Sequence, residues 1–324
     1  MLYSIIIPVY DRPEEINELL KGLTHQTFKS FEVLIVEDGS ESSCKKIVEL
    51  YTSLLDIRYY YKPNSGQGFS RNYGFDRAKG DYFIVFDSDC IVPSHYLQAV
   101  TNYLSLQKID CWGGPDRAHS SFTPLQRAID FSMTSFLSTG GIRGKSKRLS
   151  VFHPRSFNMG ISREVYRKTG GYAISQMGED IEFSIRIIKS GFSIALIEDA
   201  YVYHKRRTNL KQFFKQLHFF GRARFNISRF HPNELKFVHF LPVFFLFGIL
   251  LNPLIAIVSL FCSLILSALY ILFFMTIFIS SLLKTKSLKI ALLSILTVFI
   301  QLTAYAIGFI SESRLEHSND FTIF

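Results

Sequence analysis

Two aspartates, Asp87 and Asp89, follow an apolar segment that has the character of a strand covered on both faces. The segment is YFIVF at 82–86, a buried run typical of parallel sheets. If the extended geometry continued to Asp89, the two-residue period of a strand would place both carboxylates on one side. Carboxylate oxygens placed in this way suit Mg²⁺ or Mn²⁺ and the phosphates such ions bind. The alternative is a solvated turn in which an aspartate caps a helix.

Strand-like and helix-like segments alternate around this pair, with short links between them. Strands are predicted over 2–9, 31–36, 57–61 and 82–87, and helices over 14–23, 45–54 and 69–78. This alternation predicts a parallel sheet covered by helices on both faces. Asp11 and Asp38 end the first two predicted strands, so we expect them at the same sheet edge as Asp87 and Asp89. Ligands of open α/β sheets bind at that edge, although each aspartate alone also fits a simple turn.

Charge and hydropathy divide the rest of the 324-residue chain. Residues 205–236 carry nine Lys or Arg and one acid, whereas residues 238–283 and 290–310 carry no Lys, Arg, Asp or Glu. A helix needs about 20 residues to cross a bilayer, so 238–283 fits two helices that break at 252–253 or at 263–267, as two spans or as a re-entrant hairpin. The basic connector at 284–289 leads to a third apolar segment. The basic segments predict three spans with both clusters inside and the tail from Ser311 outside.

The segment 208–230 mixes aromatic residues with Lys and Arg, which predicts a helix in the membrane interface with its aromatic side chains toward lipid. A soluble helical domain with a very apolar core is the alternative to the whole membrane region. Because the basic segment adjoins membrane-length apolar sequence, we expect membrane lipids and no nucleic acid as partners. The apolar run Ile5–Ile7 is too short for a signal peptide and predicts a first strand, hence a cytoplasmic domain. The four cysteines are not spaced as a zinc site.

Several motifs stand in one order along the first 190 residues. They are IIIPVY at 5–10, VEDGS at 36–40, GQGFSRNYG at 66–74, FDSD at 86–89, FNMGISRE at 157–164, GGY at 170–172 and MGEDIEFSIR at 177–186. Together they closely resemble the family 2 glycosyltransferases of the GT-A fold over residues 1–205. The resemblance implies an α/β fold with a doubly covered mixed sheet, followed here by C-terminal transmembrane helices. The implied domains are a catalytic domain at 1–205, an interfacial region at 206–236, a membrane region at 237–311 and a tail at 312–324.

The resemblance also implies a role for individual residues. The turn from Pro8 through Tyr10 to Asp11, together with Asp38, would hold the nucleotide. Asp87 would hold the ribose or a metal-bound water, and Asp89 would ligate Mn²⁺ or Mg²⁺. His204 is a third candidate metal ligand, unless it merely begins the basic patch that follows it. Asp180 matches the catalytic base. The remaining candidates are Arg71, as a phosphate contact or an internal salt bridge, and the basic segment 140–148, as a loop over the diphosphate or a solvated loop.

The implied activity is inverting transfer of a sugar from a UDP- or GDP-sugar donor to a hydroxyl group. Membrane attachment suggests a lipid-linked acceptor, or another saccharide, in the assembly of a surface polysaccharide or glycolipid at the cytoplasmic face of a multi-pass membrane protein. Two alternatives stay open: a polyprenyl-phosphate sugar synthase, which needs no hydroxyl base, and a non-catalytic membrane component with a degenerate transferase domain. A processive polysaccharide synthase is disfavoured, because Trp112 is the only tryptophan and lies outside the expected Gln-x-x-Arg-Trp motif.

Overall fold

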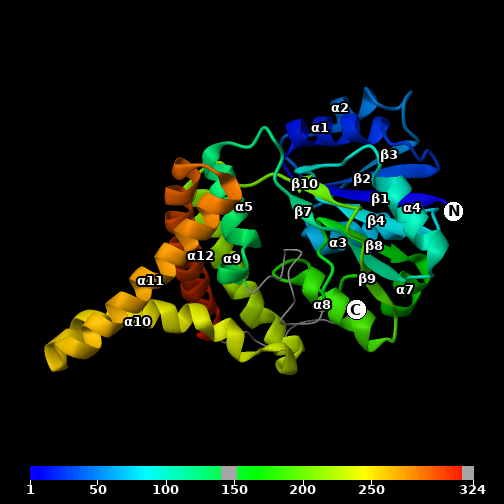
Figure 1. Ribbon diagram of the computed structural model, residues 1–324. Coiled ribbons are helices and arrows are strands. Elements are labelled where there is room, and N and C mark those ends of the chain that lie inside the picture. Colours follow the sequence, from blue (N-terminus) through cyan, green and yellow to red (C-terminus); the bar gives the residue numbers. More distant parts are fainter. Residues whose placement is uncertain (140–151, 316–324) are drawn as a thin grey trace. The chain divides into compact units, whose positions relative to one another are not determined.

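The computed structural model describes residues 1–139 and 152–315, which form two compact units (Figure 1). The sheet unit consists of residues 1–119 and 152–205. The helical unit consists of residues 120–139 and 206–315. Helix α5 (Pro124–Thr134) therefore belongs with the C-terminal helices and not with the sheet.

The sheet unit is built on a seven-stranded mixed sheet. Its strands lie in the order β3 (Ile57–Lys62), β2 (Phe31–Asp38), β1 (Tyr3–Val9), β4 (Tyr82–Phe86), β8 (Asn158–Ser162), β6 (Cys111–Gly113) and β9 (Ile194–Leu196). The four strands from β3 to β4 are parallel, whereas β8 runs antiparallel to both of its neighbours. A small second sheet joins β5 (Cys90–Ile91), β10 (Val202–His204) and β7 (Asp116–Arg117). The parallel half confirms that the carboxyl ends of the first strands share one edge.

Helices cover both faces of the large sheet. They are α1 (Pro13–Thr24), α2 (Lys45–Glu49), α3 (Gln67–Phe75), α4 (Tyr96–Leu106), α7 (Arg163–Thr169) and α8 (Glu179–Lys189). Successive side chains of β1 enter different cores: Ile5 packs in the cluster that contains residues of α1 and α4, and Ile6 packs in the cluster that contains Phe75 and Phe183. A strand buried on both faces needs apolar residues at every position, which explains the unbroken run at its centre.

The local geometry differs from the sequence prediction at two places. The predicted helix at 45–54 ends at Glu49, and the chain continues in turns to residue 54. The strand that leads to Asp87 ends at Phe86, and the following turn is closed by the backbone N–H of Cys90, which donates to the carbonyl of Asp87 at 3.1 Å. The extended geometry therefore does not continue to Asp89, because the Asp-Ser-Asp sequence favours a turn.

Gly160 on β8 leaves room for the indole of Trp112 on β6. These two residues are register partners, and a Cβ atom at position 160 would lie only 2.0 Å from the indole ring. Trp112 is fully buried. The pair therefore fixes the contact between the two antiparallel strands in the second half of the sheet.

The helical unit contains α5 (Pro124–Thr134), α6 (Phe136–Thr139), α9 (Leu210–Phe230), η1 (Pro232–Glu234), η2 (Phe237–Phe240), α10 (Leu241–Val258), α11 (Leu260–Thr285) and α12 (Leu288–Ser313). Three segments are long and apolar enough to cross a membrane: Phe237–Val258, Leu260–Thr285 and Leu288–Ser313. The break between the first two lies at Ser259, not at 252–253 or 263–267 as predicted. Pro253 stays inside α10, and the Ser259 hydroxyl caps α11 by accepting from the N–H of Cys262.

Helix α9 packs its apolar side against protein. Phe213 and Leu217 are buried in a cluster with Ile129 of α5 and Ala304 of α12, and Ile227 is buried as well. These three side chains do not face lipid, contrary to the expectation from the sequence pattern. The position of α9 at a membrane interface stays a prediction.

Candidate active site

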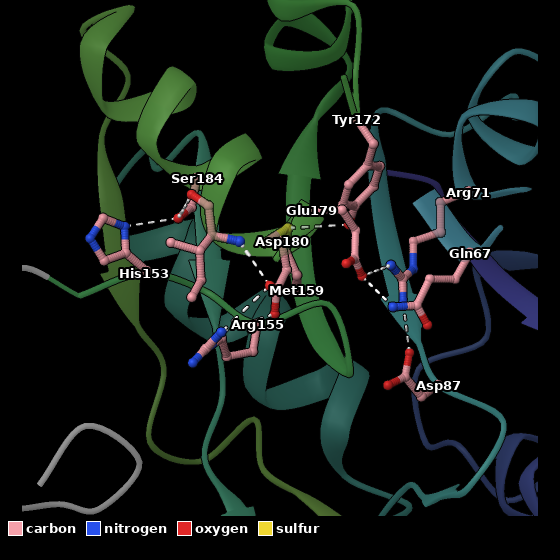
Figure 2. A network of polar contacts seen from close by, with 11 residues as sticks. Gln67, Arg71, Asp87, His153, Arg155, Met159, Tyr172, Glu179, Asp180 and Ser184 are labelled. Atoms are coloured by element: carbon pink, nitrogen blue, oxygen red, sulfur yellow. Dashed lines mark hydrogen bonds and ion pairs between the residues drawn. The ribbon is translucent and has the colours of Figure 1, made fainter. Parts of the chain in front are cut away.

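Arg71 links two acidic segments of the sheet unit. Its guanidinium is fully buried; Nη1 donates to Glu179 Oε1 at 2.9 Å and Nη2 donates to Asp87 Oδ1 at 2.8 Å (Figure 2). Arg71 lies on α3, Asp87 follows β4, and Glu179 opens α8. One side chain therefore fixes the end of the central strand relative to the start of α8. Of the two roles left open for Arg71, the structure shows the internal salt bridge.

Glu179 is the buried centre of this network. Its Oε1 accepts from Gln67 Nε2 at 2.5 Å as well as from Arg71. Burial raises the pKa of Glu179, and the charge of Asp180 raises it further, whereas Arg71 opposes the shift. Glu179 is not among the residues that the sequence singles out, because nothing in the sequence pattern distinguishes this buried contact from an exposed one.

Asp180, the predicted base, is the next residue on α8. Its Oδ1 accepts from the N–H of Ile181 at 2.8 Å, and its Oδ2 lies 3.3 Å from Arg155 Nη1 (Figure 2). The side chain of Asp180 is 17% exposed, so solvent and ligands can reach it. Arg155 lies in the segment before β8 and was not singled out from the sequence, where it is one cation among many. The predicted base is thus connected through Glu179 and Arg71 to Asp87.

Asp89 and His204 come together from distant segments of the sheet unit's sequence. The antiparallel pairing of β5 with β10 sets His204 opposite Cys90, and His204 Nε2 lies 3.1 Å from Asp89 Oδ1. The imidazole stacks on Phe157 with ring centroids 4.9 Å apart. Arg12 Nη1 approaches Asp89 Oδ2 at 3.6 Å. The structure therefore brings together two of the three predicted metal ligands, while the third, Asp87, turns toward Arg71.

The donor atoms around Asp89 fit a divalent cation. Ligand atoms of Asp89, Cys90 and His204 all lie within 4.8 Å of one another. The Cys90 thiol donates to the carbonyl of Phe157, and burial, reinforced by Asp89 and Asp87, raises its pKa, so it stays protonated and is a poor ligand. The remaining carboxylate and imidazole suit Mn²⁺ better than Mg²⁺, which prefers oxygen ligands. His204 Nδ1 is buried and has no hydrogen-bond partner among the described residues, so one ring nitrogen is left for a further ligand.

Asp38, predicted to bind the nucleotide base, holds a loop of its own unit. Its Oδ1 accepts from Lys62 Nζ at 2.6 Å and from the N–H of Ser65 at 2.9 Å, and its Oδ2 accepts from the N–H of Gly66 at 2.9 Å. Gly66 has a φ of 89°, and a Cβ there would lie 2.9 Å from Ser175. Asp38 thus shapes the glycine loop that leads into α3 and Arg71.

The turn after β1 presents an aromatic ring. Tyr10 is 53% exposed, and Asp11 adopts a left-handed φ of 51° with its Oδ1 accepting from the N–H groups of Glu41 and Ser42. Pro8 lies inside β1, where it pairs with Val36, and not in the turn. Tyr10 therefore presents an exposed ring at this end of the strand, whereas the N–H and the Oδ1 of Asp11 already have partners. The basic segment 140–148 lies outside the described residues.

The sequence model for glycosyl transferase family 2 matches residues 4–170, which is more than half of the chain. The chain belongs to glycosyl transferase family 2. The matched residues of this family 2 enzyme include Arg71, Asp87 and Asp89, whereas Asp180 and His204 lie beyond them. The roles of these last two residues therefore rest on geometry and on the resemblance of their local motifs.

Relatives of this family 2 glycosyltransferase cover it to different extents. The glycosyltransferase AglE of Haloferax volcanii is 24% identical over 257 residues, which are 77% of this chain and 82% of that protein. An uncharacterised glycosyltransferase of Rickettsia felis is 38% identical over 86 residues, which are 26% of this chain but only 14% of that protein. The match to AglE is the longer of the two, and at 77% of this chain it extends past the family match and into the helical unit.

Solved structures share the GT-A fold. The mannosyltransferase PcManGT from Pyrobaculum calidifontis, solved in complex with GDP-Man and Mn²⁺, has a TM-score of 0.61 at 14% identity and covers 96% of this chain and 87% of its own. Glucosyl-3-phosphoglycerate synthase from Mycobacterium tuberculosis, solved with Mn²⁺, UDP and glucosyl-3-phosphoglycerate, has a TM-score of 0.51 at 15% identity and covers 70% and 79%. At these identities the likeness concerns the fold alone.

Proposed function

We propose that this family 2 glycosyltransferase moves a sugar from a nucleoside diphosphate to a hydroxyl group, with inversion at the anomeric carbon and dependence on a divalent metal. The observation that carries the proposal is the chain of contacts from Asp87 through Arg71 and Glu179 to the neighbouring Asp180 (Figure 2). This network holds Asp87, which is suited to the donor, and Asp180, which is suited to the acceptor, in one connected arrangement. The GDP-Man, UDP and Mn²⁺ in the two structural neighbours support this choice of donor and ion.

Asp89 and His204 would hold the metal, with Asp87 close by for the ribose or a metal-bound water. The bound ion would supply Lewis-acid neutralisation of the leaving diphosphate. Tyr10 has an exposed ring suited to stacking on the base, and Asp38 keeps the glycine loop in place beside it. The donor site is therefore assembled at the carboxyl ends of β1, β2 and β4, the edge where α/β sheets bind ligands.

Asp180 would accept the proton of the acceptor hydroxyl. In the step the hydroxyl oxygen bonds to the anomeric carbon, the bond from that carbon to the diphosphate oxygen breaks, and the diphosphate leaves with the electron pair. Attack and departure on opposite faces of the sugar invert its configuration. Arg155, 3.3 Å from Asp180, would orient the carboxylate without touching the reacting atoms.

The acceptor is proposed to be lipid-linked, in the assembly of a surface polysaccharide or glycolipid. Residues 1–205 would form a catalytic domain at the cytoplasmic face of the membrane, and residues 206–236 an interfacial region next to the apolar helices from 237 to 311. The apolar helices support membrane association, since their long segments expose many large apolar side chains. A lipid-linked acceptor would be concentrated at the surface where such an enzyme is held.

Asp180→Asn tests the proposal. We expect kcat/KM for transfer to fall by roughly 10²–10⁴, the usual contribution of a general base, with donor binding unchanged. Asp199→Asn, which removes a carboxylate from an exposed position of the same unit, serves as the control. Transfer that survives in the Asp180 variant would indicate a lipid phosphate as the nucleophile, which needs no base. Failure of the wild type to bind any UDP- or GDP-sugar with Mn²⁺ would favour a non-catalytic role.

A further inference from the structure

The apolar surface of the helical unit is concentrated on the hairpin of α10 and α11. Figure 1 shows both helices extending away from α5, α9 and α12 to a shared free end at residues 258–260. Large apolar side chains at that end are strongly exposed, with Ile257 at 82%, Val258 at 89% and Phe261 at 73%. The segments of α10 and α11 are 6% and 11% buried, whereas that of α12 is 44% buried. The three apolar helices are therefore not equivalent.

Charged helices of the same unit cover one side of α12. Its first half meets α5, where Thr297 Oγ1 donates to the carbonyl of Ala128. Its second half runs beside α9 in close contact, since a Cβ at Gly221 or Gly308 would clash with the backbone of the opposite helix. Helix α9 carries Lys and Arg at five positions. If α12 crossed the hydrocarbon, α9 would have to enter it too, at a high cost for each charge.

The C-terminal end of α12 is tied to α9 by charge. Glu312 is fully buried and accepts from Arg222 Nε at 2.8 Å and from Arg229 Nη1 at 2.6 Å. The chain reaches α9 from the sheet unit without any apolar segment of membrane length. Arg222, Arg229 and therefore Glu312 lie on the same side of the membrane as the sheet unit.

From these contacts we infer that only the α10–α11 hairpin enters the bilayer, as a re-entrant loop that returns to the side it came from, while α12 stays on that side. The exposed surface of the hairpin then contacts the hydrocarbon core of a lipid bilayer. The C-terminus then lies on the same side as the sheet unit, in contrast to the three-span topology expected from the charge pattern. This inference concerns topology and does not depend on the proposed chemistry.

The length of the hairpin agrees with a re-entrant loop. Phe245 is in ring contact with Phe299 of α12, with centroids 6.5 Å apart, so α10 projects beyond the rest of the unit only from about this residue. The 13 residues from there to Val258 span about 20 Å at 1.5 Å per residue. The hydrocarbon core is about 30 Å thick, so the tip stops inside it.

The turn at the tip is short and pairs part of its own polar groups. Ser259 is the one residue between the two helices, its N–H donates to the carbonyl of Ile255 at 2.8 Å, and its hydroxyl accepts from the N–H of Cys262. Between the helices, Asn252 Nδ2 donates to Ser267 Oγ at 2.9 Å. A one-residue turn with these bonds exposes few polar groups, which limits the cost of placing it in hydrocarbon, where unpaired polar groups are costly.

Cysteine labelling in sealed vesicles tests the inference with the full chain. In a Cys262→Ser background, Glu49→Cys marks the sheet unit and Ser313→Cys marks the end of α12; both positions are exposed, and Cys44, Cys90 and Cys111 are buried. With a membrane-impermeant maleimide, we expect the two new thiols to behave alike in every vesicle preparation. Both should react with intact vesicles, or both should react only after permeabilisation. If one of the two thiols reacts with intact vesicles and the other reacts only after permeabilisation, α12 crosses the membrane and the inference is wrong.

The native Cys262 reports on the tip. We expect it to be protected from the impermeant reagent on both sides of the membrane and to react once the protein is solubilised in detergent. Reaction from the far side of intact vesicles would show that the hairpin crosses. Recovery of the protein as a soluble oligomer, with Cys262 protected without any lipid, would show that a second copy covers the hairpin instead.

A charge at the tip provides an independent readout. Val258→Lys should lower the fraction of protein that stays in membranes after an alkaline wash, because the ammonium group would lie in hydrocarbon. Leu106→Lys adds the same charge at an 86% exposed position of the sheet unit and serves as the control. Equal membrane fractions for the two variants would mean that the tip reaches water, which would contradict a re-entrant hairpin.

Discussion

Replacing Arg71 with Met would remove the buried cation that joins Asp87 to Glu179. Methionine keeps much of the aliphatic volume, so the main loss is charge and two hydrogen bonds. Asp87 is 31% exposed and can turn to water, but the side chain of Glu179 is only 4% exposed and would keep an uncompensated carboxylate. Breaking a buried ion pair in this way costs about 3–5 kcal/mol.

The size of the effect should depend on pH. The pKa of Glu179 is already raised above 4.5 by burial, and losing Arg71 would raise it further. Between 4.5 and the raised value the folded state binds the proton more readily than the unfolded state, so stability falls as pH rises. The Arg71→Met penalty should therefore be largest at neutral and alkaline pH, and it should shrink as pH falls toward 4.5.

Thermal unfolding of the purified protein measures this effect, followed by a probe in the sheet unit. A loss of 3–5 kcal/mol in a unit of this size corresponds to a fall in Tm of about 6–20 °C. The Arg71→Met, Glu179→Gln double variant should recover part of that loss, since it removes the uncompensated charge. An Arg71→Met protein with unchanged Tm, or a double variant less stable than Arg71→Met alone, would refute the reasoning.

Three further outcomes are expected. Glu37→Gln should lower the free energy of unfolding by about 1–3 kcal/mol at neutral pH. Burial opposes the charge of Glu37, but hydrogen bonds from Tyr59 and its other donors lower its pKa, so the ionised side chain stabilises the fold above pH 4.5. In urea titrations the difference in stability from wild type should vanish as pH falls below that value. Gly160→Ala should destabilise the sheet unit by about 1–3 kcal/mol in the same titrations, through the clash with Trp112. Glu312→Gln should lower the free energy of unfolding of the helical unit by about 3–5 kcal/mol, and its unfolding temperature with it, because it breaks two buried ion pairs. An unchanged unfolding temperature would mean that the two arginine partners are solvated.

Much of the sheet unit could be predicted because each of its signals is local. The alternation of strand and helix patterns is decided by side-chain periodicity within a few residues, and it located β1 to β4 and the shared strand edge. The sequence left open whether the strand continues to Asp89 or ends in a turn, because propensity for extension at 82–86 says little about where the strand ends. The contact of Arg71 with two carboxylates from distant segments depends on tertiary packing, which no local pattern encodes.

The membrane region shows the same limit in another form. Hydropathy identified three apolar helices, because length and lack of charge suffice for that. Hydropathy could not show that α12 is partly covered by α5 and α9, since a helix packed on protein and a helix in lipid have similar composition. The break at Ser259 was missed because Asn252-Pro253 is a stronger turn signal in isolation, yet Pro253 is accommodated inside α10.

The direct test of the central claim is Mn²⁺-dependent binding of a nucleotide sugar by calorimetry, using a panel of UDP- and GDP-sugars. We predict that the wild type binds one of them only with Mn²⁺, and that Asp89→Asn raises the Mn²⁺ concentration for half-saturation at least about tenfold. Asp199→Asn, which removes the same charge elsewhere on the sheet unit, should behave as wild type. Binding without Mn²⁺, or equal Mn²⁺ dependence in the two variants, would contradict a metal site at Asp89 and His204.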